Sequence, residues 1–168
     1  MFEKEGPKRY KSIVPRKPMI AVIGASKATD ADLKNAEQVG RLIGENGWIL
    51  INGGLEGVME ASAKGASQAG GLVVGILPTA TPDTANPYVE VPIATNLHWA
   101  RNAIIAQATD VLIAIGGSYG TLSEIGLALT HKKKVIGLAT WKIDGVTPVE
   151  SPALAVELVR VELKQLGF

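Results

Sequence analysis

The feature that most constrains the fold of this chain is a repeated alternation of short apolar runs with segments of helical periodicity. The apolar runs lack the polar alternation of a strand that faces water on one side. They are MIAVIG (19–24), WILINGG (48–54), LVVGILP (72–78), DVLIAIGG (110–117) and KVIGLA (134–139). Repeated strand–helix alternation of this kind predicts an α/β fold, with a doubly wound parallel sheet sandwiched between helices.

Local signals predict the helices and the order of two strands. Helical patterns cover 29–47, 57–71, 96–109, 120–131 and 151–168. Pro92 has no N–H for a central ladder, so 88–95 is expected to hold a short edge strand. The fully apolar segment Val111–Ile115 is expected to be a central strand, with helices on both faces of the sheet. No internal repeat or second domain is visible, which predicts one domain over 19–168 after a basic, mobile tail over 1–18.

Composition limits the available chemistry. The 168 residues include no cysteine, which excludes a disulfide scaffold, a thiolate metal site and a cysteine nucleophile. His98 and His131 are the only histidines, so no metal site is expected. A net charge of +1 predicts no attraction to nucleic acid or to anionic membranes. With no secretory signal and no apolar run approaching the roughly 18 residues of a membrane span, the expectation is a cytoplasmic protein.

Three glycine-rich loops follow predicted strands, where parallel α/β sheets bind their ligands. They are GASKATD (24–30), NGGLEGVME (52–60) and GGSYGTLSE (116–124), and none matches GxGxxG or GxxxxGK[ST]. Glycines let backbone N–H groups approach an anion, and a helix N-terminus adds partial positive charge. Together the loops predict a site for a small, phosphate-bearing anion. The candidate residues in these loops are Gly24, Ala25, Ser26, Gly53, Gly54, Gly116, Gly117, Ser118, Tyr119, Gly120 and Thr121.

Arg101 interrupts an apolar stripe on the predicted helix 96–109. The stripe, which is expected to face the core, consists of Leu97, Ala100, Ile104, Ile105 and Ala108. Burying an unpaired guanidinium on such a face costs roughly several kcal/mol, because the charged group loses its hydration. In a structural role, Arg101 either places its guanidinium in solvent or forms an ion pair with a carboxylate of this chain. In a binding role, Arg101 reaches the carboxyl edge of the sheet and binds a phosphate or carboxylate of a ligand. The last interpretation is favoured.

Glu124 has two interpretations that the residues alone leave open. Thr121 and Glu124 fit a T-x-x-E capping box, in which the glutamate caps its own helix. Alternatively, a glutamate beside Arg101 at an anion site is a general acid or base for a glycosidic bond.

Three stretches resemble the molybdenum cofactor carrier protein family. They are NGGLEGVMEASAKGA (52–66), the long segment ANPYVEVPIATNLHWARNAIIAQATDVLIAIGGSYGTLSEIGLAL (85–129) and KVIGL (134–138), within a resemblance over about residues 19–142. That family lies in a superfamily once labelled lysine decarboxylase-like, which also contains the Lonely Guy phosphoribohydrolases. The resemblance implies a Rossmann-like fold, a homo-oligomer (a dimer or a tetramer), and a pocket for a phosphate-bearing pterin or nucleotide.

The same comparison separates binding from catalysis. The Lonely Guy enzymes carry PGGxGTxxE and an arginine–lysine pair, and this chain resembles them at Arg101 and Glu124. It departs from them at Asn102, which replaces the lysine, and at Ser123, where an acidic residue is common. Within the loop, Gly116 replaces the proline and Ser118 replaces the second glycine. The resemblance therefore implies a carrier of molybdenum cofactor or a similar anion, rather than an enzyme. The alternative is a phosphoribohydrolase that cleaves the N-glycosidic bond of a nucleoside 5′-monophosphate, with Arg101 and Glu124 as its catalytic residues.

Overall fold

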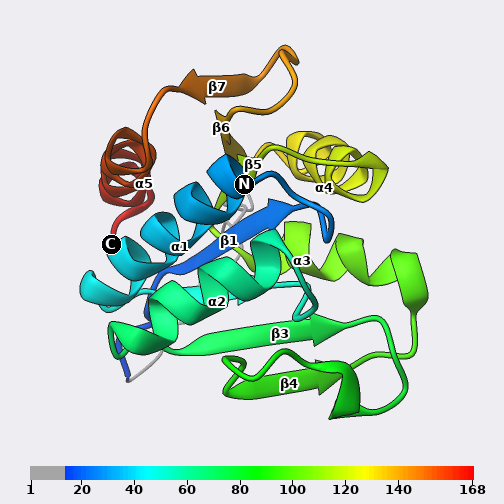
Figure 1. The fold of residues 1–168 in the computed structure, drawn as a ribbon. Coiled ribbons are helices and arrows are strands. Elements are labelled where there is room, and N and C mark those ends of the chain that lie inside the picture. The colour runs from blue at the N-terminus through cyan, green and yellow to red at the C-terminus, as the bar shows by residue number, and fades with distance from the viewer. Residues whose placement is uncertain (1–13) are drawn as a thin grey trace, which may run out of the picture.

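A computed structural model describes residues 14–168 as one seven-stranded sheet with helices on both faces (Figure 1). The strands are β1 (Met19–Gly24), β2 (Ile49–Asn52), β3 (Val73–Leu77), β4 (Val91–Ala94), β5 (Val111–Ile115), β6 (Lys134–Leu138) and β7 (Val146–Val149). Their order is β4-β3-β2-β1-β5-β6-β7, and every neighbouring pair is parallel. The predicted α/β sandwich is therefore confirmed.

Among residues 14–168, five α-helices and two short 3-10 helices lie between or after the strands. They are α1 (Asp30–Glu45), α2 (Val58–Gln68), η1 (Pro82–Thr84), η2 (His98–Arg101), α3 (Asn102–Ala108), α4 (Tyr119–Thr130) and α5 (Pro152–Leu166). Helices α1, α2 and α5 cover one face of the sheet, while α3 and α4 cover the other. Parallel strands joined by helical crossovers require this two-sided cover.

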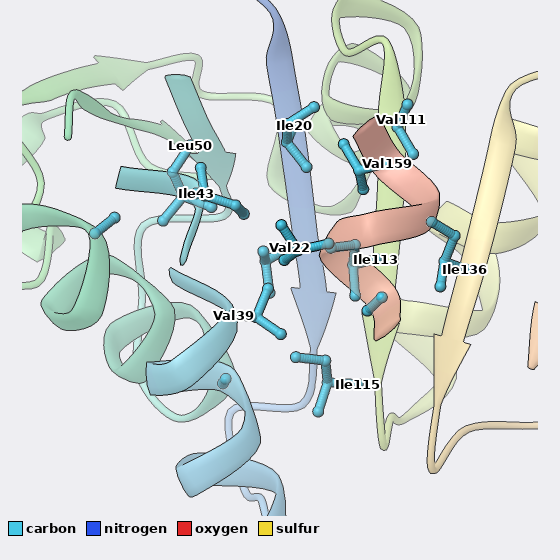
Figure 2. Close-up of a cluster of buried hydrophobic side chains, with 14 of the residues drawn as sticks. Ile20, Val22, Val39, Ile43, Leu50, Val111, Ile113, Ile115, Ile136 and Val159 are labelled. Carbon is cyan, nitrogen blue, oxygen red and sulfur yellow. The ribbon is translucent and has the colours of Figure 1, made fainter. Parts of the chain in front are cut away.

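Alternate residues of each central strand enter two separate cores. On the α1 side, Ile20 and Val22 of β1 pack against Val39 and Ile43 of α1 (Figure 2). On the other side, Ala21 and Ile23 pack with side chains of α3 and α4. Both faces of β1 are thus buried, which is why its sequence shows no polar alternation.

Most predicted elements appear close to their expected bounds. Val111–Ile115 lies inside the sheet between β1 and β6, and β4 with Pro92 lies at an edge. Strand β7 was not predicted, because Val146 and Val149 are its only apolar residues besides Pro148, too few for an apolar run. Of the tail expected over 1–18, the part through residue 13 lies outside the described residues.

The predicted apolar stripe of helix 96–109 is wrong. This segment is split into η2 and α3, and its buried side chains include Arg101, Asn102 and Ile105. Leu97 and Ile104, which were expected in the core, are exposed. Only Ile105 of the five stripe residues is buried, so helical spacing did not identify the side of this segment that faces the core.

Candidate functional site

The three glycine-rich loops meet at one edge of the sheet, because they follow the adjacent strands β2, β1 and β5. Between them and the first turns of α2, α3 and α4 lies a cavity of about 70 Å³. The candidate residues that line it are Gly24, Ser26, Gly53, Arg101, Ser118, Gly120, Thr121 and Glu124. The topology therefore brings residues from all three loops into one small site.

The remaining candidates support the site without lining the cavity. Ala25 accepts a hydrogen bond from the Val58 N–H through its carbonyl at 3.1 Å. Gly54 has a φ of +72° in the turn after β2, and its N–H donates to Asn52 Oδ1 at 2.8 Å. Gly54 and Ala25 are thus turn residues.

The start of the third loop also lies outside the cavity. Gly116 and Gly117 have φ values of +53° and +140°, which favour glycine. A Cβ on Gly116 would lie 2.8 Å from a carboxylate oxygen of Asp32. Tyr119, the first residue of α4, is 88% exposed and does not line the cavity. These three candidates therefore flank the lining residues of the same loop.

Arg101 is buried beneath the second loop. Its Nη1 donates to the carbonyl of Gly53 at 2.8 Å and also to the carbonyl of Ile76, so it joins the ends of β2 and β3. Its Nε is buried and has no hydrogen-bond partner among residues 14–168. Burial lowers the pKa of the guanidinium, and the charge of Glu124 opposes this shift. The edge of the guanidinium that carries Nε can bind a carboxylate or phosphate through parallel N–H···O hydrogen bonds.

The fit around Arg101 explains the glycine at position 53. A Cβ on Gly53 would lie 2.5 Å from Nη1 and 2.6 Å from Nη2 of Arg101. Any side chain here would displace the guanidinium, so this glycine serves a close approach rather than a left-handed turn. Arg101 is buried and donates to backbone carbonyls. Within the part of the chain that the structure describes, it therefore neither reaches solvent nor forms an ion pair with a carboxylate, which were its two possible structural roles.

The capping-box interpretation of Glu124 is wrong. Helix α4 begins at Tyr119 with Ser118 as its N-cap, and Thr121 Oγ1 accepts the Ser118 N–H at 3.2 Å. Glu124 is the sixth residue of the helix, too far along to cap it, and its side chain lies in the cavity. Burial raises the pKa of Glu124 to about 7, and the positive charge of Arg101 lowers it in part. A carboxyl group in this range can donate or accept a proton near neutral pH.

Asn102 and Ser123 form a neutral pair beside Glu124. Asn102 Nδ2 donates to Ser123 Oγ at 2.9 Å, and Ser123 Oγ donates to the carbonyl of Gly120 at 2.6 Å. The pair ties the start of α3 to the first turn of α4. Two of the positions at which this chain departs from the Lonely Guy pattern, Asn102 and Ser123, are therefore in direct contact.

Several cavity residues were not predicted as site residues. Leu55 and Met59 come from the second loop and the first turn of α2, and Val22, Ile23, Trp99 and Asn102 complete the lining. Apolar lining residues carry the same sequence signal as core residues, so only their position after a glycine-rich loop could have identified them. Among residues 14–168 no cluster of three or more histidine, aspartate or glutamate side chains could hold a metal ion. No helix in the same range is long and apolar enough to cross a membrane.

Comparison with known proteins gives three consistent findings. The family model described as the SLOG cluster4 family matches residues 17–162. The structure of the molybdenum cofactor binding protein from Rippkaea orientalis is 40% identical, with a TM-score of 0.85 over 88% of this chain and 98% of that one. An uncharacterized protein of Archaeoglobus fulgidus is 49% identical over 82% of this chain and 91% of its own length.

A fourth similarity concerns an enzyme. The cytokinin riboside 5′-monophosphate phosphoribohydrolase of Mycobacterium tuberculosis is 32% identical over 73% of this chain and 71% of its own length. The chain is thus similar both to a cofactor-binding protein and to a phosphoribohydrolase, as the resemblance of its motifs implied.

Proposed function

The chain belongs to the SLOG cluster4 family, and from this premise we propose that it is a carrier that binds molybdenum cofactor or a similar phosphate-bearing pterin or nucleotide. The similarity to a molybdenum cofactor binding protein over nearly its whole length supports this proposal. The cofactor is cargo in this proposal, held by the glycine-rich loops and released to another protein.

The observation that carries the proposal is the unpartnered Nε of buried Arg101 beside the start of α4. A buried charged donor without a partner is costly, so the site is built for a group that supplies an acceptor. The N-terminus of α4, with its partial positive charge, lies at the same cavity. A phosphate oxygen satisfies both features.

The size of the cavity indicates how such a ligand binds. Pockets that enclose a whole ligand measure about 300–1,000 Å³. The space around Arg101 and Glu124 measures about 70 Å³. It therefore admits an anionic end group, while the rest of the ligand lies along the outside of the loops.

One observation favours phosphoribohydrolase activity as the alternative. Glu124, with a pKa of about 7, lies in the same cavity as Arg101 and has the protonation range of a general acid or base. In that reaction Glu124 would move the proton while water attacks the ribose carbon, and Arg101 would stabilise negative charge. Against it, Asn102 and Ser123 are neutral where the related enzymes carry charge.

Native mass spectrometry separates the two functions. The protein is mixed with molybdenum cofactor released from a molybdoenzyme and, separately, with AMP, and free adenine is measured. We expect a retained cofactor adduct and little or no adenine. Turnover of AMP near the usual enzyme rate of about 10 s⁻¹ would reverse this ranking.

The Glu124→Gln variant sharpens this test. If the protein is a carrier, the cofactor adduct persists in the variant, because glutamine keeps the shape and removes a negative charge near the anion. If it is an enzyme, adenine release falls by about 10² or more while AMP still binds.

We further propose that the protein assembles as a homo-oligomer through the face formed by β4, η2 and α3. The exposed apolar side chains on this face and on the neighbouring α4 are Val91, Ile93, Leu97, Trp99, Ile104 and Leu122. Strand β4 is an edge strand in which all four residues are exposed. Exposed apolar side chains beside an open strand edge are typical of a protein interface, and a second copy of this chain is the partner proposed here.

A further inference from the structure

A second cavity lies between β6, β7 and the loop 139–145 that connects them, and this loop leaves β6 at the same edge of the sheet as the glycine-rich loops. Its volume is about 330 Å³, which falls in the range of small-molecule pockets. The residues that shape it include Thr140, Trp141, Ile143, Val146, Pro148 and Val149. None of the candidate site residues lines it, so it is separate from the cavity at Arg101.

Trp141 connects this second cavity to the third glycine-rich loop. A Cβ on Gly117 would lie 2.8 Å from Cζ3 of the Trp141 indole, so the ring lies directly against the loop backbone. The same residue lines the second cavity and is 38% exposed. A ligand that binds the loop by its anionic end therefore has an aromatic surface immediately beside it. Aromatic rings of this kind stack with flat heterocycles.

Thr140 supplies an unused polar group in the same place. Its Oγ1 is buried and has no hydrogen-bond partner among residues 14–168. The preceding residue, Ala139, has a φ of +53°, which is unfavourable for a residue with a Cβ. Strained backbone and unsatisfied polar groups cluster at binding sites, where the ligand supplies what the protein lacks.

From these observations we infer that the cavity at Thr140 and Trp141 binds the planar nitrogen heterocycle of the ligand whose phosphate end lies on the loop 116–121. The indole stacks on the ring system, and Thr140 Oγ1 bonds to a ring nitrogen or a carbonyl oxygen. This inference rests on the proposed function, since it requires a ligand with an anionic end and a flat ring. The 70 Å³ cavity around Arg101 is too small for such a ring.

Calorimetric titration of two variants tests the inference, with AMP and inorganic phosphate as probes. Trp141→Leu should weaken AMP binding by about tenfold or more, because stacking on one aromatic ring contributes about that much. Its phosphate affinity should stay within about twofold of the wild type. Thr140→Val should weaken AMP binding by about 2- to 10-fold, the range of one neutral hydrogen bond.

Thermal unfolding provides an independent readout. Because Thr140 Oγ1 is unpartnered, Thr140→Val should leave the Tm unchanged or raise it while affinity falls. Thr147→Val is the matched control, since Thr147 lies on β7 but does not line the cavity. The control should bind both probes like the wild type.

The outcomes separate this inference from the proposed function. If Trp141→Leu weakens phosphate and AMP equally, the indole only supports the loop and the inference is wrong. If both variants bind AMP like the wild type, the ring lies elsewhere, although the proposed function stands. If the wild type binds neither probe and no molybdenum cofactor, both proposals fail.

Discussion

At the scale of single residues, Glu124 makes the stability of this protein depend on pH. Burial raises its pKa from 4.5 to about 7, so between these values the folded state binds more protons than the unfolded state. Stability from this group is therefore fully present below about pH 4.5 and is lost as the pH rises through 7. The pKa shift of Glu124 corresponds to a decrease on the order of 3 kcal/mol in the free energy of unfolding between these pH values.

Glu124→Gln should remove this dependence. Urea denaturation at pH 5 and pH 8 should show the wild type weakening toward pH 8 and the variant changing much less. Glu150→Gln, at an exposed glutamate, is the control, and its stability should change between pH 5 and pH 8 as much as that of the wild type. If the wild type has the same free energy of unfolding and the same urea m-value at pH 5 and pH 8, burial does not raise the pKa of Glu124 as described.

Arg101 stabilises the site through its hydrogen bonds and also provides the positive charge that binds an anion. Arg101→Met removes the donors to the carbonyls of Gly53 and Ile76 and leaves Glu124 buried without a compensating charge. We expect a loss of about 3 kcal/mol in the free energy of unfolding, together with weaker anion binding. Arg160→Met is the control on α5, where the paired side chains are half exposed and the loss should be below about 1 kcal/mol. Equal losses in the two variants would show that the buried bonds of Arg101 do not stabilise the fold.

At the scale of elements, α1 and α2 pack closely because glycines lie at their crossing. A Cβ on Gly40 would lie 2.0 Å from the carbonyl oxygen of Ser62, and one on Gly65 would lie 2.0 Å from that of Glu37. Gly40→Ala must push the helices apart and should cost more than about 3 kcal/mol. Gly126→Ala on α4 has open space and should stabilise by about 0.5–1 kcal/mol. Urea denaturation of both variants checks the contrast, and a tolerated Gly40→Ala would contradict this packing.

The elements also show how far sequence reasoning reaches. Apolar runs were enough to predict β1, β2, β3, β5 and β6, because local composition reports burial on both faces. The exposed edge strand β4 was predicted from Pro92 instead. The loops 24–30, 52–60 and 116–124 were predicted to meet, since strand ends in a parallel sheet share an edge. The contacts of Arg101 with Gly53 and Ile76 could not be predicted, because they join segments 48 and 25 residues apart. Nor could local spacing show that the capping box of α4 consists of Ser118 and Thr121 rather than Thr121 and Glu124.

At the scale of the whole molecule, the exposed apolar face predicts that one copy is not the functional unit. Ile104→Glu places a charge in the proposed contact and should reduce the assembly to a monomer of 17.6 kDa in light scattering. Val161→Glu is the matched control, since Val161 is similarly exposed, at 44% against 37%, but lies on α5 across the sheet. A wild type that is monomeric at micromolar concentration would refute the interface.

The assembly should also affect ligand binding, because Trp99 belongs to both regions. Its side chain is 76% exposed on the apolar face, yet it lines the cavity that contains Arg101 and Glu124. A second copy seated on this face would therefore lie beside the mouth of the cavity. We expect Ile104→Glu to weaken AMP binding in calorimetry, whereas Val161→Glu should bind like the wild type. If the Ile104→Glu monomer binds AMP with full affinity, the site is complete within one chain and the apolar face serves assembly alone.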